Sequence, residues 1–362
     1  MQTGALIVFA VVVGARFVVP LFIPRFPLPA IIGSLVLDAA DQTIFQAFGY
    51  DPPEYQSYDK AMDVYYLAVA YLSTMRNWSS RPAVRVARFL YFYRLVGVVA
   101  FELTQLRPLL LIFPNTFEYF FIAYETIRLR WNPARIHLRA WITIAAAIWI
   151  FVKLPQEWWI HIAQLDVTDM MAAHRWILPT LLVLLAVAAV VLRTVVWPRL
   201  PAPDHPWRLA ADPLPEDIDE AAERYRWVAA NHRLWSSGTL EKVVLMGLLW
   251  VIYAEVLPAG TAGPAERFLG VAVFVVINAA ISLTVARRAR GLESALATFG
   301  VRLLINVLLV LAASQLLGGT LEPLSAAFFV LLLSLITLLD DRFRPVHEAR
   351  FAPSRTAAGS GT

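Results

Sequence analysis

The chain has 362 residues, of which 59% are hydrophobic and only 16% are charged, whereas soluble domains carry about 25% charged residues. This composition excludes an ordinary soluble domain. It predicts an all-α, polytopic integral membrane helical bundle, because several long apolar runs must lie in lipid. The net charge of +4 does not indicate a nucleic-acid partner, since the arginines cluster between apolar runs, where positive charge sets membrane topology. The lack of cysteine excludes disulfides, thiolate metal sites and thiol catalysis.

The N-terminal part begins with an apolar run over residues 4–23 that predicts a retained membrane-spanning helix. This run lacks the basic start of a signal peptide and is too long for its apolar region. Residues 31–50 are also long enough to cross the membrane but contain Asp38 and Asp41. They therefore either cross with one polar face turned inward or lie at the interface. A proline turn follows, and the next helix is predicted over about 58–76.

Two arginine clusters predict how the chain is oriented. The first cluster follows the helix over 58–76 and contains no acidic residue; its members are Arg76, Arg81, Arg85 and Arg88. Because clustered arginines mark the cytoplasmic side, crossings predicted over 86–105 and 108–127 return the second cluster, within 128–139, to that side. The acidic segment 37–66 then lies on the outer face.

The following segments continue this arrangement. A crossing over 141–152 leads to an aromatic, acidic stretch through residue 169, which predicts an interfacial helix on the outer face. Residues 176–196 cross back. Residues 198–238 form the one long polar segment, and 215–235 within it predict a capped amphipathic helix.

The last part of the chain consists of four further apolar runs. They predict crossings over 240–257, 268–286, 296–317 and 324–339. The chain thus crosses the membrane about eleven times if residues 31–50 span it, and about ten times if they do not.

These elements divide the chain into four predicted parts. They are an N-terminal membrane bundle with the acidic segment and the outer interfacial helix over 1–197, a cytoplasmic linker with an amphipathic helix over 198–238, a C-terminal four-helix membrane bundle over 239–343 and a disordered tail over 344–362. Arginines around 342–350 predict a cytoplasmic C-terminus. The strong preference for arginine over lysine is typical of a GC-rich bacterial genome, so the bacterial plasma (inner) membrane is the predicted location.

The acidic segment carries two pairs of aspartates at helical spacing. Asp38 and Asp41 are three residues apart, and Asp59 and Asp63 are four apart, so in helices each pair shares one face. Two such faces on adjacent helices could hold a divalent cation such as Mg²⁺ or Mn²⁺. In a purely structural interpretation Asp59 is instead a first-turn acid, and Asp63 pairs with Lys60 or faces solvent.

The spacing Asp38-x2-Asp41-x17-Asp59-x3-Asp63 resembles the acidic skeleton of the CDP-alcohol phosphatidyltransferases. In these integral membrane enzymes, four aspartates bind metal ions and activate an alcohol that displaces CMP. The resemblance therefore implies a metal-dependent transferase. The chain departs from the family in the residues between the aspartates, where Gln42 and Tyr55 replace glycines and Phe45-Gln46 replaces Ala-Arg. The family's site also faces the cytoplasm, whereas this acidic turn is predicted on the outer face.

The position of the acidic segment after the first helix is similar to membrane glycosyltransferases that use polyprenyl-phosphate sugars. In those enzymes a carboxylate in the first outer loop acts on the acceptor or binds metal. This resemblance is one of architecture, and it agrees with the predicted outer location.

A second set of polar residues lies inside the predicted spans. Its members are Arg94, Glu102, Glu118, Glu125, Arg302 and Asn306. Such residues face the bundle interior or one another. They predict either a path for ions or protons, or buried pairs that fix how the helices pack.

The sequence supports neither a zinc site nor a nucleotide-binding loop. His161, Asp166, Asp169 and His174 are ligand types that zinc uses, but their spacing matches no metal motif, and interfacial hydrogen bonding is the preferred interpretation for both histidines. Phosphate-binding glycine loops are absent from the sequence, which argues against an ATP-driven pump.

The resulting functional prediction is metal-assisted group transfer on a lipid or lipid-linked substrate. Asp38, Asp41 and Asp59 are the predicted metal ligands, and Asp63 is the predicted base. One alternative is a transporter or channel for an ion or small polar solute, lined by the intramembrane polar residues. Another is a non-catalytic subunit of an envelope complex. Membrane lipids are the expected partners, and a membrane-protein partner or a homo-oligomer remains open.

Overall fold

The computed structural model describes residues 2–48, 55–163, 174, 176–215, 218–231, 236–256, 300, 304 and 323–352. Every element over these residues is a helix, and none of them lies in a strand, so the predicted all-α class is confirmed for the described part of the chain. The crossing predicted over 268–286 lies outside the described residues, and so does the crossing predicted over 296–317 apart from residues 300 and 304.

Helix α3 (Tyr55–Asn77) is the central helix of the bundle. It contacts five neighbours, which are α1 (Gln2–Val18), α2 (Pro27–Ala47), α4 (Arg81–Thr104), α12 (Ser237–Val256) and α15 (Pro323–Phe351). Nearly every residue of α3 from Ala61 onward is buried, on all sides of the helix. Small side chains such as Ala61, Ala68 and Ala70 let the neighbouring backbones approach closely.

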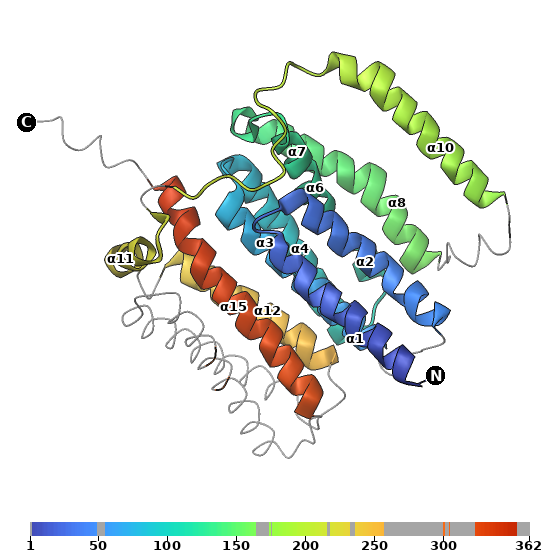
Figure 1. Ribbon diagram of the computed structural model, residues 1–362, viewed down its shortest axis with the longest axis horizontal. Helices are drawn as coiled ribbons and strands as arrows, with labels where there is room; N and C mark the ends of the chain where they lie inside the picture. Colours follow the sequence, from blue (N-terminus) through green and yellow to red (C-terminus); the bar gives the residue numbers. More distant parts are fainter. Residues whose placement is uncertain are drawn as a thin grey trace, which may run out of the picture.

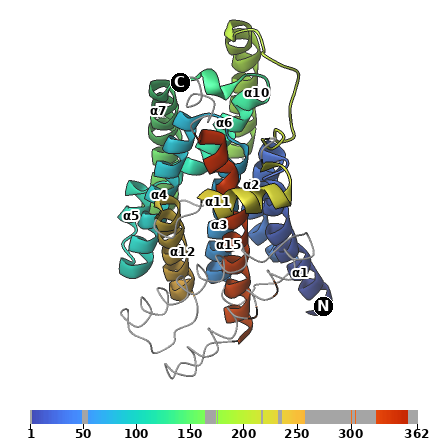
Figure 2. The ribbon, with the colours of Figure 1, turned by 90° about the vertical axis from the view of Figure 1, so that its left-hand side faces the viewer.

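The helices of the bundle run nearly parallel or antiparallel to one another (Figure 1). The N-terminus lies at one end of the bundle, and the C-terminal end of α15 lies at the other. The short helix α11 (Ala221–Asn231) crosses α15 near that second end (Figure 2).

Helices α1 and α2 form a hairpin that is fastened to α3. A short helical turn follows α1, and α2 begins with Pro27 in its first turn, where the missing proline N–H costs no hydrogen bond. The Tyr65 hydroxyl donates to the Phe17 carbonyl at 3.0 Å, and the two rings stack with centroids 5.5 Å apart. These contacts fix the register of α1 against α3.

The predicted crossing over 108–127 is interrupted. It divides into α5 (Pro108–Ile112) and α6 (Thr116–Arg128), with Pro114 between them. Phe113 packs so closely on α4 that a Cβ on Gly97 would lie 2.1 Å from the Phe113 Cβ. Only glycine fits at position 97, because the Phe113 side chain occupies the space of any larger residue.

The predicted crossing over 141–152 and the interfacial helix after it form one continuous helical stretch, Leu138–Ile162. It contains α7 (Leu138–Ile148) and α8 (Leu154–Glu157). Wide π-helical turns lie before and after α8. Pro155 therefore does not end the helix, since a local change of helical pitch accommodates its missing N–H.

Helix α10 (Ile177–Val191) lies at the edge of the bundle (Figure 1). Its apolar side chains are exposed, including Leu182 at 57% and Val183 at 61%. A helix that is apolar on all sides and exposed is typical of a lipid-facing helix. Short helical turns complete the described elements, at Val19–Phe22, Pro133–Arg135, Trp149–Lys153, Trp158–Ile162, Leu192–Val196 and Trp197–Arg199.

Three helical stretches in the described residues are long and apolar enough to cross a membrane: Pro27–Ala47, Leu138–Ile162 and Ile177–Arg199. They support a membrane protein. This number is smaller than the ten or eleven predicted crossings. Charged residues lower the mean hydropathy of other long helices, as Asp59, Lys60 and Asp63 do in α3.

Candidate metal centre

Three helices bring five charged side chains together at one point. Arg16 comes from α1, Asp38 and Asp41 from α2, and Asp59 and Asp63 from α3. Each aspartate pair shares one face of its helix because of the three- and four-residue spacings. The four carboxylates are called the aspartate cluster below.

Arg16 is the centre of this arrangement and is only 4% exposed. Its Nη1 donates to Asp41 and, at 2.7 Å, to Asp59. Its Nη2 donates to Asp38 and, at 2.7 Å, to Asp63. One guanidinium thus orients four carboxylates from two helices, since its planar fork presents several donors at fixed angles.

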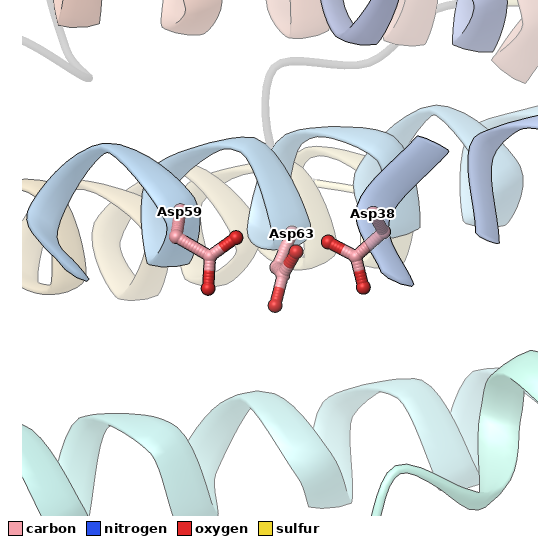
Figure 3. A group of neighbouring side chains, drawn as sticks. All are labelled: Asp38, Asp59 and Asp63. Carbon is pink, nitrogen blue, oxygen red and sulfur yellow. The ribbon is translucent and has the colours of Figure 1, made fainter. Parts of the chain in front are cut away.

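The four carboxylates differ in depth. The Asp41 side chain is fully buried, whereas those of Asp38, Asp59 and Asp63 are 25%, 33% and 40% exposed. Oxygens of these last three side chains all lie within 4.8 Å of one another. Figure 3 shows the three carboxyl groups in a row, with Asp63 between the other two.

The spacing of these oxygens suits a divalent cation. Oxygen ligands lie about 2.0–2.6 Å from Mg²⁺ or Ca²⁺, so two ligands on opposite sides of the ion are roughly 4–5 Å apart. When ionised, the aspartate cluster carries three more charges than the single guanidinium offsets. A cation bound beside Arg16 would reduce the repulsion between these carboxylates.

The geometry differs from the predicted division of roles. The sequence prediction has Asp41 among the ligands and Asp63 as the base, whereas the three clustered oxygens belong to Asp38, Asp59 and Asp63. Asp41 lies deeper, against Arg16, and its Oδ1 accepts from the Gln42 backbone N–H at 2.6 Å.

Sequence reasoning missed Arg16 as a member of the site. The signal was present, because Arg16 is a lone charged residue within an apolar run and such residues usually have a buried partner or a function. Its partners follow only from the packing of α1 against both α2 and α3.

Aromatic rings border the aspartate cluster. The Arg16 guanidinium lies 5.5 Å from the centroid of the Tyr58 ring. The Phe9 ring lies 6.1 Å from Tyr58 and 5.6 Å from Phe45. These rings lower the local dielectric and so strengthen the ion pairs beside them.

Among the residues of the predicted polar path, Arg94 and Glu102 have separate local partners. Arg94 donates to the Phe113 carbonyl at 2.9 Å. Glu102 is buried and pairs with Lys60 at 3.1 Å. Both contacts join neighbouring segments and so help to fix how these segments pack.

Glu125 is held in another place. It accepts from the Trp78 indole at 2.8 Å and from Arg128 at 2.6 Å. Arg128 also donates to the Ala210 carbonyl at 3.0 Å, which fastens the polar linker to α6. The two remaining members of the predicted path, Arg302 and Asn306, lie outside the described residues.

Glu118 belongs to a buried polar network beside the aspartate cluster. It accepts from Tyr66, which lies one turn beyond Asp63 on α3, and from the Asn115 amide at 3.0 Å. The Asn115 backbone N–H donates to Glu157 at 3.2 Å. Glu157 in turn contacts His161 at 3.0 Å. Hydrogen bonds thus continue from α3 to the half-buried His161.

His161 pairs with Glu157 by helical spacing, in agreement with a hydrogen-bonding role. His174 packs near Trp176, with ring centroids 6.2 Å apart. Asp166 and Asp169 lie outside the described residues. Within the described part of the chain, the three-aspartate group is where metal-ligand atoms converge.

The spacing Asp38-x2-Asp41-x17-Asp59-x3-Asp63 therefore places four carboxylates around one arginine. Comparisons with protein-family models, with curated proteins and with solved structures found no match to this chain.

Proposed function

We propose that this chain is a membrane enzyme that catalyses metal-assisted group transfer on a lipid or lipid-linked substrate. Asp38, Asp59 and Asp63 bind the divalent cation, Mg²⁺ or Mn²⁺. The observation that carries the proposal is the convergence of three partly exposed carboxylates, with oxygens within 4.8 Å of one another, on a buried arginine. Carboxylate oxygens are the ligands that these hard cations prefer.

Within this proposal, Arg16 and Asp41 position the ligands. Arg16 contacts all four carboxylates, and the fully buried Asp41 holds its guanidinium in place on the side away from solvent. Asp63 acts as a third ligand, because its oxygen lies with those of Asp38 and Asp59. The cation supplies Lewis acidity toward a phosphoryl or carbonyl oxygen of the substrate.

A lipid substrate is supported by the surface of the two helices that carry Arg16 and Asp38. Large apolar side chains on these helices are exposed, including Ile7 at 59%, Val11 at 64% and Val36 at 58%. Such surface is stable in contact with acyl chains and unfavourable in water. A lipid headgroup therefore has a route to the partly exposed carboxylates.

The proposed topology keeps the ten or eleven crossings of the bacterial plasma membrane, with the arginine-rich segments and the C-terminus in the cytoplasm. The chain has no cysteine, so Gln56→Cys introduces a single reactive thiol three residues before Asp59 in the sequence. Impermeant maleimide is expected to label Gln56→Cys on whole cells and Arg135→Cys only after lysis. The opposite result would reverse the topology and move the acidic site to the cytoplasmic side.

Metal binding is the first test of the function. We expect Mn²⁺ to bind the detergent-solubilised chain in electron paramagnetic resonance titrations, and Asp38→Asn, Asp59→Asn and Asp63→Asn each to weaken it by at least about tenfold. Asp219→Asn, an exposed aspartate on the linker, is the matched control. Equal Mn²⁺ affinity in the wild type and all four variants would show that these three aspartates do not bind the cation.

Turnover is the second test. Cells expressing the wild-type chain are compared by lipid mass spectrometry with cells expressing Asp59→Asn at equal abundance. The proposal expects at least one lipid or lipid-linked species to change in abundance with the wild-type chain only. Identical lipid profiles, together with normal Mn²⁺ binding, would reject the transferase and leave a cation-binding membrane protein.

A further inference from the structure

A polar cavity of about 390 Å³ lies at the arginine-rich end of the bundle, where the N-termini of α4 and α12 meet the C-terminal part of α15. It shares no residue with the aspartate cluster. The side chains that determine its charge are Arg81, Arg85, Arg88, Arg344, His347, Glu241 and Glu348. We call this cavity the arginine pocket.

Four arginines line the arginine pocket against two carboxylates, Glu241 and Glu348. Positive charge therefore remains in excess, although Arg344 also pairs with Asp340 at 2.5 Å. Glu241 lies 3.3 Å from the Arg88 Nε and 3.6 Å from an Arg344 terminal nitrogen, so this one carboxylate pairs with two guanidinium groups. Arg81 donates to the Phe351 carbonyl at 2.7 Å, which brings no negative charge. Arg85 makes no hydrogen bond or ion pair with any described residue. An anion is the ligand that this arrangement favours.

Two buried polar atoms of the pocket have no hydrogen-bond partner among the described residues. They are the His347 Nδ1 and the Arg88 Nε, and the second of these lies 3.3 Å from Glu241 without making a hydrogen bond. Buried polar atoms without a partner are costly, and they often mark a place where a ligand or water completes the hydrogen bonds. Burial, followed by the charges of Arg88 and Arg344, lowers the pKa of His347 to about 3. The low pKa therefore reflects the burial of His347 first and the neighbouring guanidinium charges second.

The start of α12 adds two features to the same cavity. A Cβ on Gly238 would lie 2.8 Å from a Glu348 carboxylate oxygen and 3.1 Å from the Arg344 Cδ, so glycine brings the α12 backbone close to α15. The first backbone N–H groups of α12 also lie at this end, where the helix dipole favours negative charge.

An apolar groove continues from the arginine pocket along α4. Its volume is about 420 Å³, and it is lined by Arg85, Arg88, Phe89, Phe92, Tyr93 and Val96. These residues recur every three to four positions and so form one face of α4. From Arg85 to Val96 the helix rises roughly 16 Å. Because Arg85 and Arg88 line both cavities, the polar and apolar spaces meet at these two arginines.

We propose that the arginine pocket and the groove on α4 together bind a phosphate-bearing lipid. The phosphate lies among Arg85, Arg88 and Arg344, where bidentate guanidinium contacts suit its oxygens. The acyl chain lies along Phe89, Phe92 and Val96. Val96 is 46% exposed and Phe89 is 59% exposed, so a chain gains apolar contact there without displacing the core. The site is independent of the metal-assisted activity, because it lies at the other end of the bundle.

Native mass spectrometry of the detergent-solubilised full chain tests this proposal with four probes. They are dioleoyl phosphatidic acid, dioleoyl phosphatidylcholine, dioleoylglycerol and inorganic phosphate. We expect phosphatidic acid to bind most tightly, because it alone combines an uncompensated phosphate charge with acyl chains. Arg85→Gln is expected to weaken that binding about tenfold, the loss of one charge-assisted contact. Exposed Arg139→Gln is the control and should leave it unchanged.

A groove variant separates lipid from free phosphate. Val96→Asn is expected to weaken phosphatidic acid binding and to leave inorganic phosphate binding unchanged. Neither variant removes a contact that holds the fold, since Arg85 pairs with no described residue and Val96 is exposed. Equal binding of phosphatidylcholine and phosphatidic acid, or phosphatidic acid binding that is unaffected by Arg85→Gln, would overturn the proposal. Phosphate binding as tight as lipid binding, with no effect of Val96→Asn, would also overturn it, in favour of a free-anion site.

Discussion

The two ends of the bundle show opposite solutions to the same electrostatic problem. At the acidic end, four carboxylates surround the single guanidinium of Arg16. At the other end, four arginines line a pocket that holds two carboxylates, those of Glu241 and Glu348. In both places a few buried ion pairs hold several like charges together and leave an excess of one sign.

The difference between the ends lies in access and in shape. The acidic site is a close group of three partly exposed carboxylates, which suits a small cation. The arginine pocket is a cavity of about 390 Å³ joined to an apolar groove, which suits a larger amphiphilic anion. The charge and the size of the ligand that each site suits therefore depend on how its charged side chains are packed.

Removing the central charge of the acidic end has the largest expected effect. Arg16→Met leaves four carboxylates without their shared counter-charge, so the free energy of unfolding should fall by about 3–5 kcal/mol. Thermal and denaturant unfolding in detergent measure this loss, with exposed Arg139→Met as the control. Added Mg²⁺ or Mn²⁺ should recover part of it, because the cation replaces the missing positive charge. Unchanged stability would show that Arg16 does not hold the acidic end together.

The equivalent change at the arginine-rich end is Glu241→Gln. Its expected cost is smaller, about 1–3 kcal/mol, because Arg344 keeps its contact with Asp340 at 2.5 Å. The same variant should bind phosphatidic acid more tightly, since the pocket loses one of its two competing carboxylates. Unfolding and native mass spectrometry give both values, with Glu223→Gln on α11 as the control. Weaker phosphatidic acid binding by a folded Glu241→Gln variant would contradict the proposal that excess positive charge in the pocket binds the lipid.

The smallest expected effect concerns pH. His347 has a folded pKa of about 3, against 6.5 for an unperturbed histidine. The unfolded chain therefore takes up a proton below about pH 6.5 that the folded chain takes up only near pH 3, and stability falls as pH decreases through this window. At pH 5 the loss attributable to His347 is about 1–2 kcal/mol.

The measurement for His347 is a difference between two pH values. Unfolding free energies at pH 7 and pH 5 are compared for wild type and His347→Gln, so that the lost ring contact with Phe351 cancels. The variant should lose less stability on acidification than the wild type. An equal loss in both would mean that burial and the neighbouring arginines do not lower the pKa of His347.

The acidic site shows how far sequence reasoning extends. The spacing of Asp38 with Asp41, and of Asp59 with Asp63, predicted two acidic helix faces, and these aspartates do share faces of α2 and α3. Arg16 was visible as a lone charge in an apolar run. Its contact with all four carboxylates was not predictable, because it depends on α1 packing against two other helices.

The arginine-rich end depended still more on packing. The sequence pattern of Arg81, Arg85 and Arg88 predicts the side of the membrane on which they lie. It does not predict a binding site. Their neighbours Arg344 and His347 come from a helix more than two hundred and fifty residues later in the sequence. Contacts of such long range leave no periodic signal, so the cavity could not be inferred from residue spacing.

The sequence by itself determined the helical class, the apolar character and the separation of acidic from basic segments along the chain. These properties follow from composition and from local periodicity, which each segment carries alone. Only the tertiary structure decided which charges meet: Arg16 with four aspartates at one end, and Glu241 with the arginines at the other. The physical reason is that a buried charge takes its partner from whichever helix packs against it, and that choice depends on the fit of whole helix surfaces.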